Sequence, residues 1–132
     1  MPKGRVPERF HDLLASKALG HLATVGTDGR PQVNPVWFIF DGERVLLSVK
    51  ADTVKYRNLR STPYAAMSVL DPERPGRYIE IRGEVEAMEL YETLAWVNQL
   101  AHKYTGADFT GGRDGEHRYK VTIRVDAWTG QG

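Results

Sequence analysis

Short segments in which apolar residues alternate with polar ones, or run together, are separated along the chain by turn-forming residues. Such patterns are typical of β-strands. We predict strands over residues 20–25, 31–40, 43–50, 64–70, 77–88 and 118–126. In the clearest of them, residues 77–88, the positions expected to face one side are Ile79, Ile81, Val85 and Ala87. The pair Asp41-Gly42 predicts a two-residue hairpin turn.

Three other segments have apolar residues at helical spacing. Helices are predicted over residues 8–18 and 89–104, and a short helix is predicted after Lys50, with Asp52 or Thr53 as its N-cap. The buried stripe of the long helix is expected to comprise Leu90, Leu94, Val97, Ala101 and Tyr104. Residues 105–115 are rich in glycine, which predicts a loop.

Six strands in mostly hairpin order, with few helices, predict a mainly β fold with some α-helix, built as a small antiparallel barrel. A chain of 132 residues is expected to form one domain, residues 1–132. The formal net charge is only +1, so attraction to nucleic acid or to a membrane is expected to be weak. Because no apolar run could span a bilayer and no signal core precedes the fold, we expect a cytoplasmic protein without membrane association.

Several kinds of catalytic chemistry are missing from the sequence. Cysteine is absent, and the four histidines are too widely spaced to predict a metal site. Neither a phosphate-binding glycine loop nor a serine nucleophile motif occurs, and no catalytic residue can be assigned. An enzyme with this sequence would therefore depend on an organic cofactor.

The most informative segment is residues 50–60, in which the cations Lys50, Lys55, Arg57 and Arg60 follow an apolar strand. A strand that leads into a capped helix with several cations is suited to binding an anion, most simply a phosphate. The alternative is an ordinary solvated helix face.

Pro35 interrupts the predicted strand 31–40. Because proline donates no hydrogen bond to a sheet, it marks an edge, a bulge or a break. Backbone groups near a break could bind a planar heterocycle, but a bulge that only bends the barrel explains the proline equally well.

The order of these signals resembles a known family. The resembling segments are residues 20–25, 29–37, 45–50, 55–60, 77–85 and 125–132. Together they resemble the pyridoxamine 5′-phosphate oxidase-like split-barrel flavoproteins, and most closely the actinobacterial branch that uses the deazaflavin F420. The resemblance implies a six-stranded split barrel that forms a homodimer, with two cofactor sites between the subunits.

The resemblance also implies which residues bind the cofactor. Lys55 and Arg60 would hold its phosphate. The ring system and its side chain would contact Asn34, Pro35, Val36, Trp37, Ser48, Val49 and Lys50. The partner subunit would contribute Tyr78, Ile79 and Glu80.

The leading interpretation is an F420-dependent oxidoreductase that transfers a hydride to or from a small organic substrate. The alternatives are an FMN-dependent oxidase or reductase on the same scaffold and a non-catalytic cofactor carrier. A further alternative is a nucleic-acid-binding barrel with Trp37 as a stacking platform, but the near-zero net charge argues against it.

Two further expectations concern surfaces. Trp37, Phe38 and Phe40 are expected on outer strand faces, where a large apolar patch would favour a dimer. The loop 105–115 either closes over the cofactor through Phe109 or Arg113, or is a plain surface connection.

Overall fold

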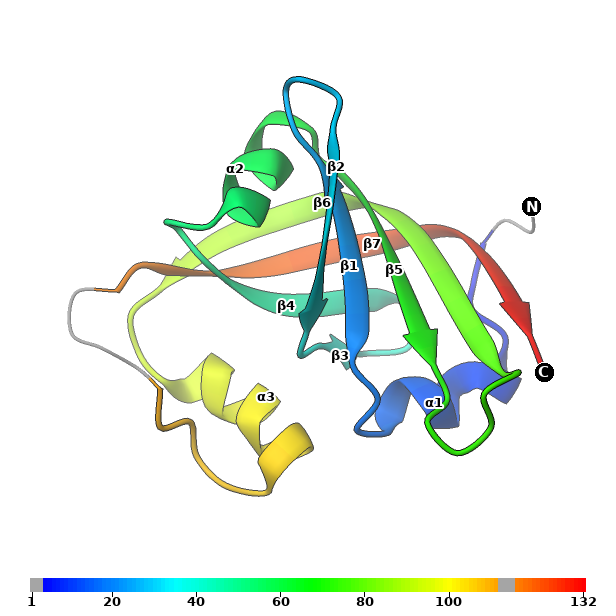
Figure 1. Cartoon of the computed structure of the whole chain (residues 1–132). Coiled ribbons are helices and arrows are strands. Elements are labelled where there is room, and N and C mark those ends of the chain that lie inside the picture. The colour runs from blue at the N-terminus through cyan, green and yellow to red at the C-terminus, as the bar shows by residue number, and fades with distance from the viewer. Residues whose placement is uncertain (1–3, 112–115) are drawn as a thin grey trace.

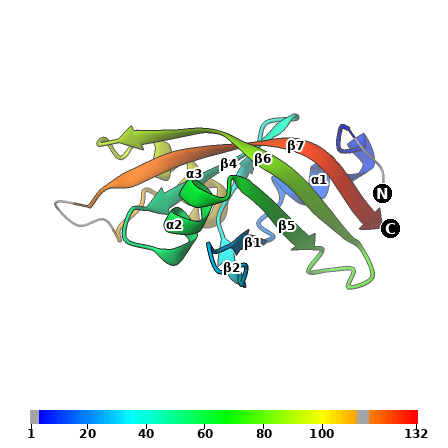
Figure 2. The ribbon, with the colours of Figure 1, turned by 90° about the horizontal axis from the view of Figure 1, so that it is seen from above.

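The structure, a computed structural model, describes residues 4–111 and 116–132. Within these residues, seven strands form one antiparallel sheet in the order β2-β1-β5-β6-β7-β4-β3. The strands are β1 (Gly20–Val25), β2 (Pro31–Val36), β3 (Ile39–Phe40), β4 (Arg44–Lys50), β5 (Tyr64–Leu70), β6 (Tyr78–Tyr91) and β7 (Arg118–Gln131). The sheet curls into a half-barrel (Figures 1 and 2), which confirms the predicted mainly β split-barrel fold.

The helical segments lie at the ends of the sheet. They are the 3-10 turn η1 (Glu8–Phe10) and the helices α1 (His11–Ala15), α2 (Val54–Ser61) and α3 (Ala95–Thr105). Figure 1 shows α1 near the end where β5 finishes and β6 begins, α2 near the opposite end of β6, and α3 beside β4. Within residues 4–111 and 116–132, no helix combines the length and apolarity needed to cross a membrane.

The predicted strand 31–40 is divided into β2 and β3, which raises the strand count from six to seven. The break lies at Trp37 and Phe38 and not at Pro35, which pairs with His21 inside β2. Because β2 is an edge strand, the missing amide proton of Pro35 costs the sheet little.

The prediction of a helix over residues 89–104 was wrong for its first turns. The strand β6 continues to Tyr91, which pairs with Arg118, and α3 begins only at Ala95. As a result Leu90 and Leu94 are 49% and 51% exposed instead of buried. The side chains that α3 does bury are Trp96, Val97, Leu100 and Ala101.

Both long strands bend at irregularities in their pairing. The register between β6 and β7 shifts between Arg82 and Gly83 and again between Val85 and Ala87. A side chain at Gly83 would overlap the backbone carbonyl of Arg124, so the close approach of the strands requires glycine there. Past the bulge β7 continues to Gln131, five residues beyond the prediction, because it pairs with β6 as far as Tyr78.

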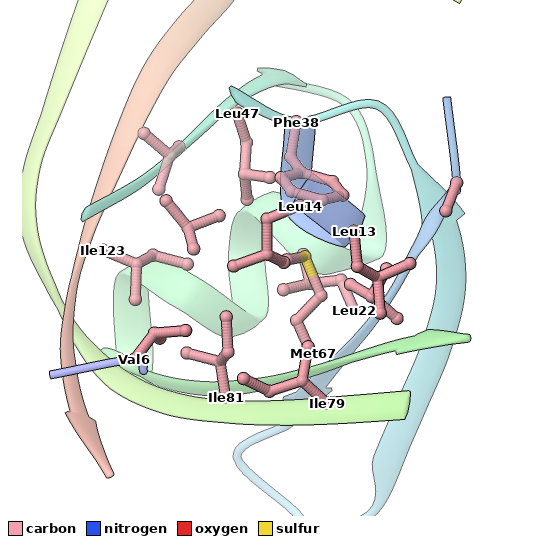
Figure 3. Packing of buried hydrophobic residues seen from close by; sticks show 14 of the residues in the cluster. Val6, Leu13, Leu14, Leu22, Phe38, Leu47, Met67, Ile79, Ile81 and Ile123 are labelled. Atoms are coloured by element: carbon pink, nitrogen blue, oxygen red, sulfur yellow. The ribbon is translucent and has the colours of Figure 1, made fainter. Parts of the chain in front are cut away.

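The core fills the concave side of the sheet. Figure 3 shows Leu22, Met67, Ile79 and Ile123 from the strands converging with Leu13 and Leu14 of α1. Phe38 and Phe40 were predicted on outer faces, but Phe38 is fully buried in this cluster and Phe40 packs against it. The chain breaks between β2 and β3 at the point where the Phe38 ring enters the core.

Candidate functional site

The basic segment folds as a strand, a turn and a capped helix. The Thr53 hydroxyl accepts a hydrogen bond from the Tyr56 amide at 3.3 Å and donates one to the Lys50 carbonyl at 2.7 Å. Thr53, and not Asp52, is therefore the N-cap of α2. This turn places α2 directly after the end of β4.

Two buried residues hold α2 against the sheet. The side-chain amide of Asn58 donates a hydrogen bond to the Thr24 hydroxyl of β1 at 3.0 Å. Leu59 is 1% exposed and belongs to the core cluster. These contacts define which side of α2 faces the protein.

Lys55 lies on that inward side, one helical turn before Asn58 and Leu59. Its side chain is half-buried, and burial lowers the pKa of its ammonium group. Among residues 4–111 and 116–132, the Lys55 ammonium has no hydrogen-bond or ion-pair partner. A partly desolvated cation without a partner is costly, and an anion that bound it would remove that cost.

Arg60 lies on the outer side of the same helix. At about 100° per residue, it is turned about 140° from Lys55 around the helix axis. Its guanidinium lies 5.7 Å from the centre of the Tyr56 ring, which in turn packs 4.9 Å from the Tyr119 ring of β7. An anion held by both cations would therefore lie on the flank of α2 that carries Tyr56.

Arg57 faces a different place. It lines a hollow of about 580 Å³ between α2 and the β1–β2 turn, together with Arg30 and Gln32. The helix therefore separates Arg57 from Lys55, and the four cations of residues 50–60 do not form a single cluster.

At the end of β4, Lys50 already has a partner. Its ammonium is 3.5 Å from Glu116, which also pairs with Arg118 at 2.9 Å. Burial opposes ionisation of Glu116, but Arg118 and Lys50 together hold the pKa of its carboxyl below the ordinary value. Lys50 is therefore less available to a ligand than Lys55.

The other two predicted residues of β4 differ in what they expose. The Ser48 hydroxyl forms a hydrogen bond with the Tyr91 hydroxyl. The Val49 side chain is 1% exposed and fills the core, so only its backbone could contact a ligand.

The predicted ring-binding segment from Asn34 to Trp37 forms the end of β2 and the break that follows it. The Trp37 ring stacks on Tyr104 of α3, with centroids 5.4 Å apart and planes inclined by 6°. The Phe109 and Trp37 rings are nearly perpendicular, with centroids 6.5 Å apart, and the Arg118 guanidinium lies 4.9 Å from the centre of the Phe109 ring. Arg113, the other proposed loop contact, lies outside the described residues, and closure of the loop stays a prediction.

Two residues of α3, neither of which was predicted to belong to the site, lie beside this segment. The Lys103 ammonium donates to the carbonyls of Leu14 and Phe38 at 2.9 and 2.8 Å, and the Tyr104 hydroxyl donates to the Ala18 carbonyl at 3.0 Å. Burial lowers the pKa of Lys103 to about 8 and raises the pKa of Tyr104 to about 12. No local signal marked them as part of the site, because the backbone carbonyls that they bond lie 65 or more positions away.

The chain does not bring Tyr78, Ile79 and Glu80 to α2. They lie at the start of β6, near α1, while α2 lies near the other end of that strand (Figures 1 and 2). Ile79 is fully buried in the core, and Glu80 accepts hydrogen bonds from Arg82 and Thr129. A site that includes Tyr78 and Glu80 together with Lys55 requires a second subunit.

In the part of the chain that the structure describes, no group of three or more histidine, aspartate or glutamate side chains could hold a metal ion.

Comparison with known proteins agrees with the fold. A family model for pyridoxamine 5′-phosphate oxidase matches residues 6–131. A solved structure named F420 reductase is 40% identical, with 94% of this chain and 98% of that chain covered and a TM-score of 0.87. HupZ of group A Streptococcus is 16% identical, with 95% and 93% covered and a TM-score of 0.68. General stress protein 26 of Bacillus anthracis is 15% identical, with 94% and 92% covered and a TM-score of 0.67. The last two likenesses concern the fold alone.

Proposed function

The chain belongs to the pyridoxamine 5′-phosphate oxidase family, and we propose that it is an oxidoreductase that uses F420 to transfer a hydride to or from a small organic substrate. The likeness to the structure named F420 reductase, at 40% identity over 94% of this chain, supports this choice of cofactor. The observation that carries the proposal is the half-buried Lys55 ammonium without a partner in the described residues.

The residues of α2 and of the end of β2 fit a phosphate-bearing tricyclic cofactor. Lys55 would bind the phosphate from the inward side of α2, and Arg60 would approach it from the outer side past Tyr56. The unpaired edge of β2 offers backbone groups near Trp37 to the ring system. The remaining proposed contacts are Asn34, Pro35, Val36, Ser48, Val49 and Lys50.

The cofactor would supply the redox chemistry, since a bound deazaflavin can accept or donate a hydride. This chain would contribute binding, orientation and exclusion of water. Trp37, held by Tyr104, would present a rigid aromatic wall beside the ring and so favour a fixed orientation of the reactants.

FMN is the second candidate cofactor, because a phosphate site and an aromatic wall suit both molecules and the family match is to a flavin-binding group. We therefore keep an FMN-dependent oxidase or reductase as the second candidate function.

We also propose that the protein is a homodimer, although not through Phe38, which is buried. Several exposed apolar residues lie instead on the outer face of β1, β2 and β5, where Val25, Val33 and Tyr64 are 36%, 58% and 58% exposed. Tyr78 and Glu80 pair with Leu70 and Ser68 on this same face. A second copy seated there would therefore lie against the residues expected to complete its cofactor site.

A direct test is to titrate the purified protein with F420 and with FMN side by side and to follow cofactor fluorescence. We expect saturable binding of F420, and weaker binding of FMN. Tight binding of FMN alone would favour the second candidate, and the absence of binding to either would overturn the proposal.

A further inference from the structure

Phe38 occupies the break between β2 and β3, where its backbone has lost its regular strand partners. Both of its polar backbone groups are bonded instead by side chains of α3. The Phe38 amide donates to the Tyr104 hydroxyl at 3.4 Å, and the Phe38 carbonyl accepts from the Lys103 ammonium at 2.8 Å. A segment that would otherwise be irregular is thus tied to a helix 65 positions later in the chain.

The Lys103 ammonium makes further contacts besides its hydrogen bond to the Phe38 carbonyl. Its ammonium lies 3.9 Å from the centre of the Phe38 ring and also donates to the Leu14 carbonyl at 2.9 Å. One cation therefore joins α3, the end of α1 and the β2–β3 connection. Cation–π contact and two carbonyl acceptors compensate the ammonium group for its partial burial.

Tyr104 acts on the neighbouring residue through its ring. The ring stacks on Trp37, while the hydroxyl is held by the Ala18 carbonyl and the Phe38 amide. The Lys103 ammonium also donates to this hydroxyl at 3.3 Å. These bonds hold the Tyr104 ring in place, and the stacked ring in turn restrains the Trp37 indole.

We infer that Lys103 and Tyr104 are positioning residues that hold the segment from Asn34 to Trp37 in its ligand-binding conformation. The inference rests on the proposed function, since it takes this segment as part of the cofactor site. Neither residue touches the cofactor in this view. They act by fixing the backbone at Phe38 and the indole of Trp37, which lowers the cost of ordering these groups when a ligand binds.

The test uses four variants of the full chain. Lys103→Met removes the ammonium but keeps the side-chain length, and Tyr104→Phe keeps the stacking ring but removes the hydroxyl. Lys17→Met, on an exposed lysine, controls for the loss of a charge. Ile123→Val, in the core of β7, controls for a general loss of stability.

The first readout is hydrogen exchange without cofactor. We expect faster exchange at residues 36–40 in Lys103→Met and in Tyr104→Phe, and unchanged protection of β6 in these two variants. In both control variants, protection of residues 36–40 should be unchanged. The second readout is F420 titration, in which we expect affinity to fall about tenfold in Lys103→Met and to stay at the parent value in both controls.

The outcomes separate the two ideas. Unchanged exchange at residues 36–40 in both Lys103→Met and Tyr104→Phe would overturn the positioning role, and so would parent-like affinity in Lys103→Met. An Ile123→Val variant that loses as much affinity as Lys103→Met would also overturn it, because the effect would then follow stability alone. If the parent binds neither F420 nor FMN, the proposed function fails, and the exchange result by itself decides whether α3 holds Phe38.

Discussion

The side-chain amide of Asn58 in α2 donates a hydrogen bond to the hydroxyl of Thr24 in β1, and both side chains are buried. We predict that Asn58→Ala lowers the free energy of unfolding by about 1–3 kcal/mol, because it leaves the Thr24 hydroxyl buried without this partner. Urea denaturation measures the change. Since α2 carries Lys55 and Arg60, cofactor affinity should fall in the same variant.

A double-mutant cycle with Thr24→Val measures the interaction energy between Asn58 and Thr24. We expect the double variant Thr24→Val/Asn58→Ala to lose less than the sum of the two single variants, because neither partner is then left unpaired. Strictly additive losses would mean that the hydrogen bond contributes little to holding α2.

For the proposed phosphate contact, Lys55→Met should affect binding and stability in opposite directions. Loss of one charge-assisted contact of about 1.5–3 kcal/mol predicts roughly ten- to hundredfold weaker cofactor binding. The cofactor-free variant should be at least as stable as the parent, because a partly desolvated ammonium without a described partner has been removed. Fluorescence titration and urea denaturation give the two values.

Lys17→Met is the matched control and should leave affinity unchanged. Arg60→Ala should also weaken binding, with little effect on stability, because the side chain is exposed. Parent-like affinity in the Lys55→Met/Arg60→Ala double variant would show that the phosphate is not bound at α2.

Arg77 is predicted to make the protein sensitive to acid. Its guanidinium donates to Asp12 at 2.6 Å and to Asp71 at 3.0 Å. The hydrogen bond from Arg77 holds the pKa of Asp12 below the ordinary 3.8. Hydrogen bonds from backbone amides and from Arg77 together lower the pKa of Asp71. As the pH falls, the unfolded chain therefore binds protons at these two carboxyls before the folded chain does. The stabilisation that the two carboxylates contribute is present above about pH 4 and is lost as the pH falls further.

Arg77→Met should consequently lower the free energy of unfolding at neutral pH. It should also lose less further stability than the parent on acidification from pH 7 to about 3. Denaturation curves recorded across this range test the prediction, and parallel pH profiles for the two proteins would contradict it.

At the bulge in β6, Gly83→Ala should be strongly destabilising, because the new methyl group would meet the Arg124 backbone carbonyl, which cannot move aside as a side chain can. We expect a loss of about 1–3 kcal/mol, at the upper end of this range. Gly76→Ala is the control, since a methyl group there meets no described atom within 4 Å, and it should change stability by less than about 0.5 kcal/mol. Equal effects in the two variants would mean that β6 and β7 can move apart at Gly83 to accommodate the methyl group.

The proposed dimer predicts a molar mass of twice the chain mass by light scattering at micromolar concentration. Tyr64→Glu, on the outer face of β5, should shift the protein towards monomer. Leu94→Glu, at a similarly exposed position at the start of α3, should not. A monomeric parent would reject both the dimer and a cofactor site shared between subunits.

The parts of the fold that the sequence predicted correctly depend on local chemistry. The strands β1 and β5 begin and end at the predicted residues, because apolar alternation and flanking turn residues are visible within a few positions. The hairpin after Phe40 is also confirmed, although its turn lies one residue later than predicted. The Asp41 amide donates to the Arg44 carbonyl at 3.1 Å, which leaves Gly42, at a φ of 104°, and Glu43 as the two turn residues. The same holds for the Thr53 cap, one of two residues expected there.

The errors arose where a distant partner decided the local structure. Residues 89–91 have helical spacing, yet they remain in β6 because they pair with residues 118–120 of β7. Phe38 reads as a strand residue, yet the chain breaks there because its ring fills the core.

The candidate site divides in the same way. The sequence by itself determined that a strand, a capped helix and several cations follow one another, and the predicted anion site depends on nothing more. Only the tertiary structure decided that Lys55 faces inward without a described partner, that Lys50 is paired with Glu116, and that α3 holds Phe38. Burial and ion pairing depend on which segments meet in space, and residues 38 and 103 meet only because the sheet curls and brings α3 to the β2–β3 connection.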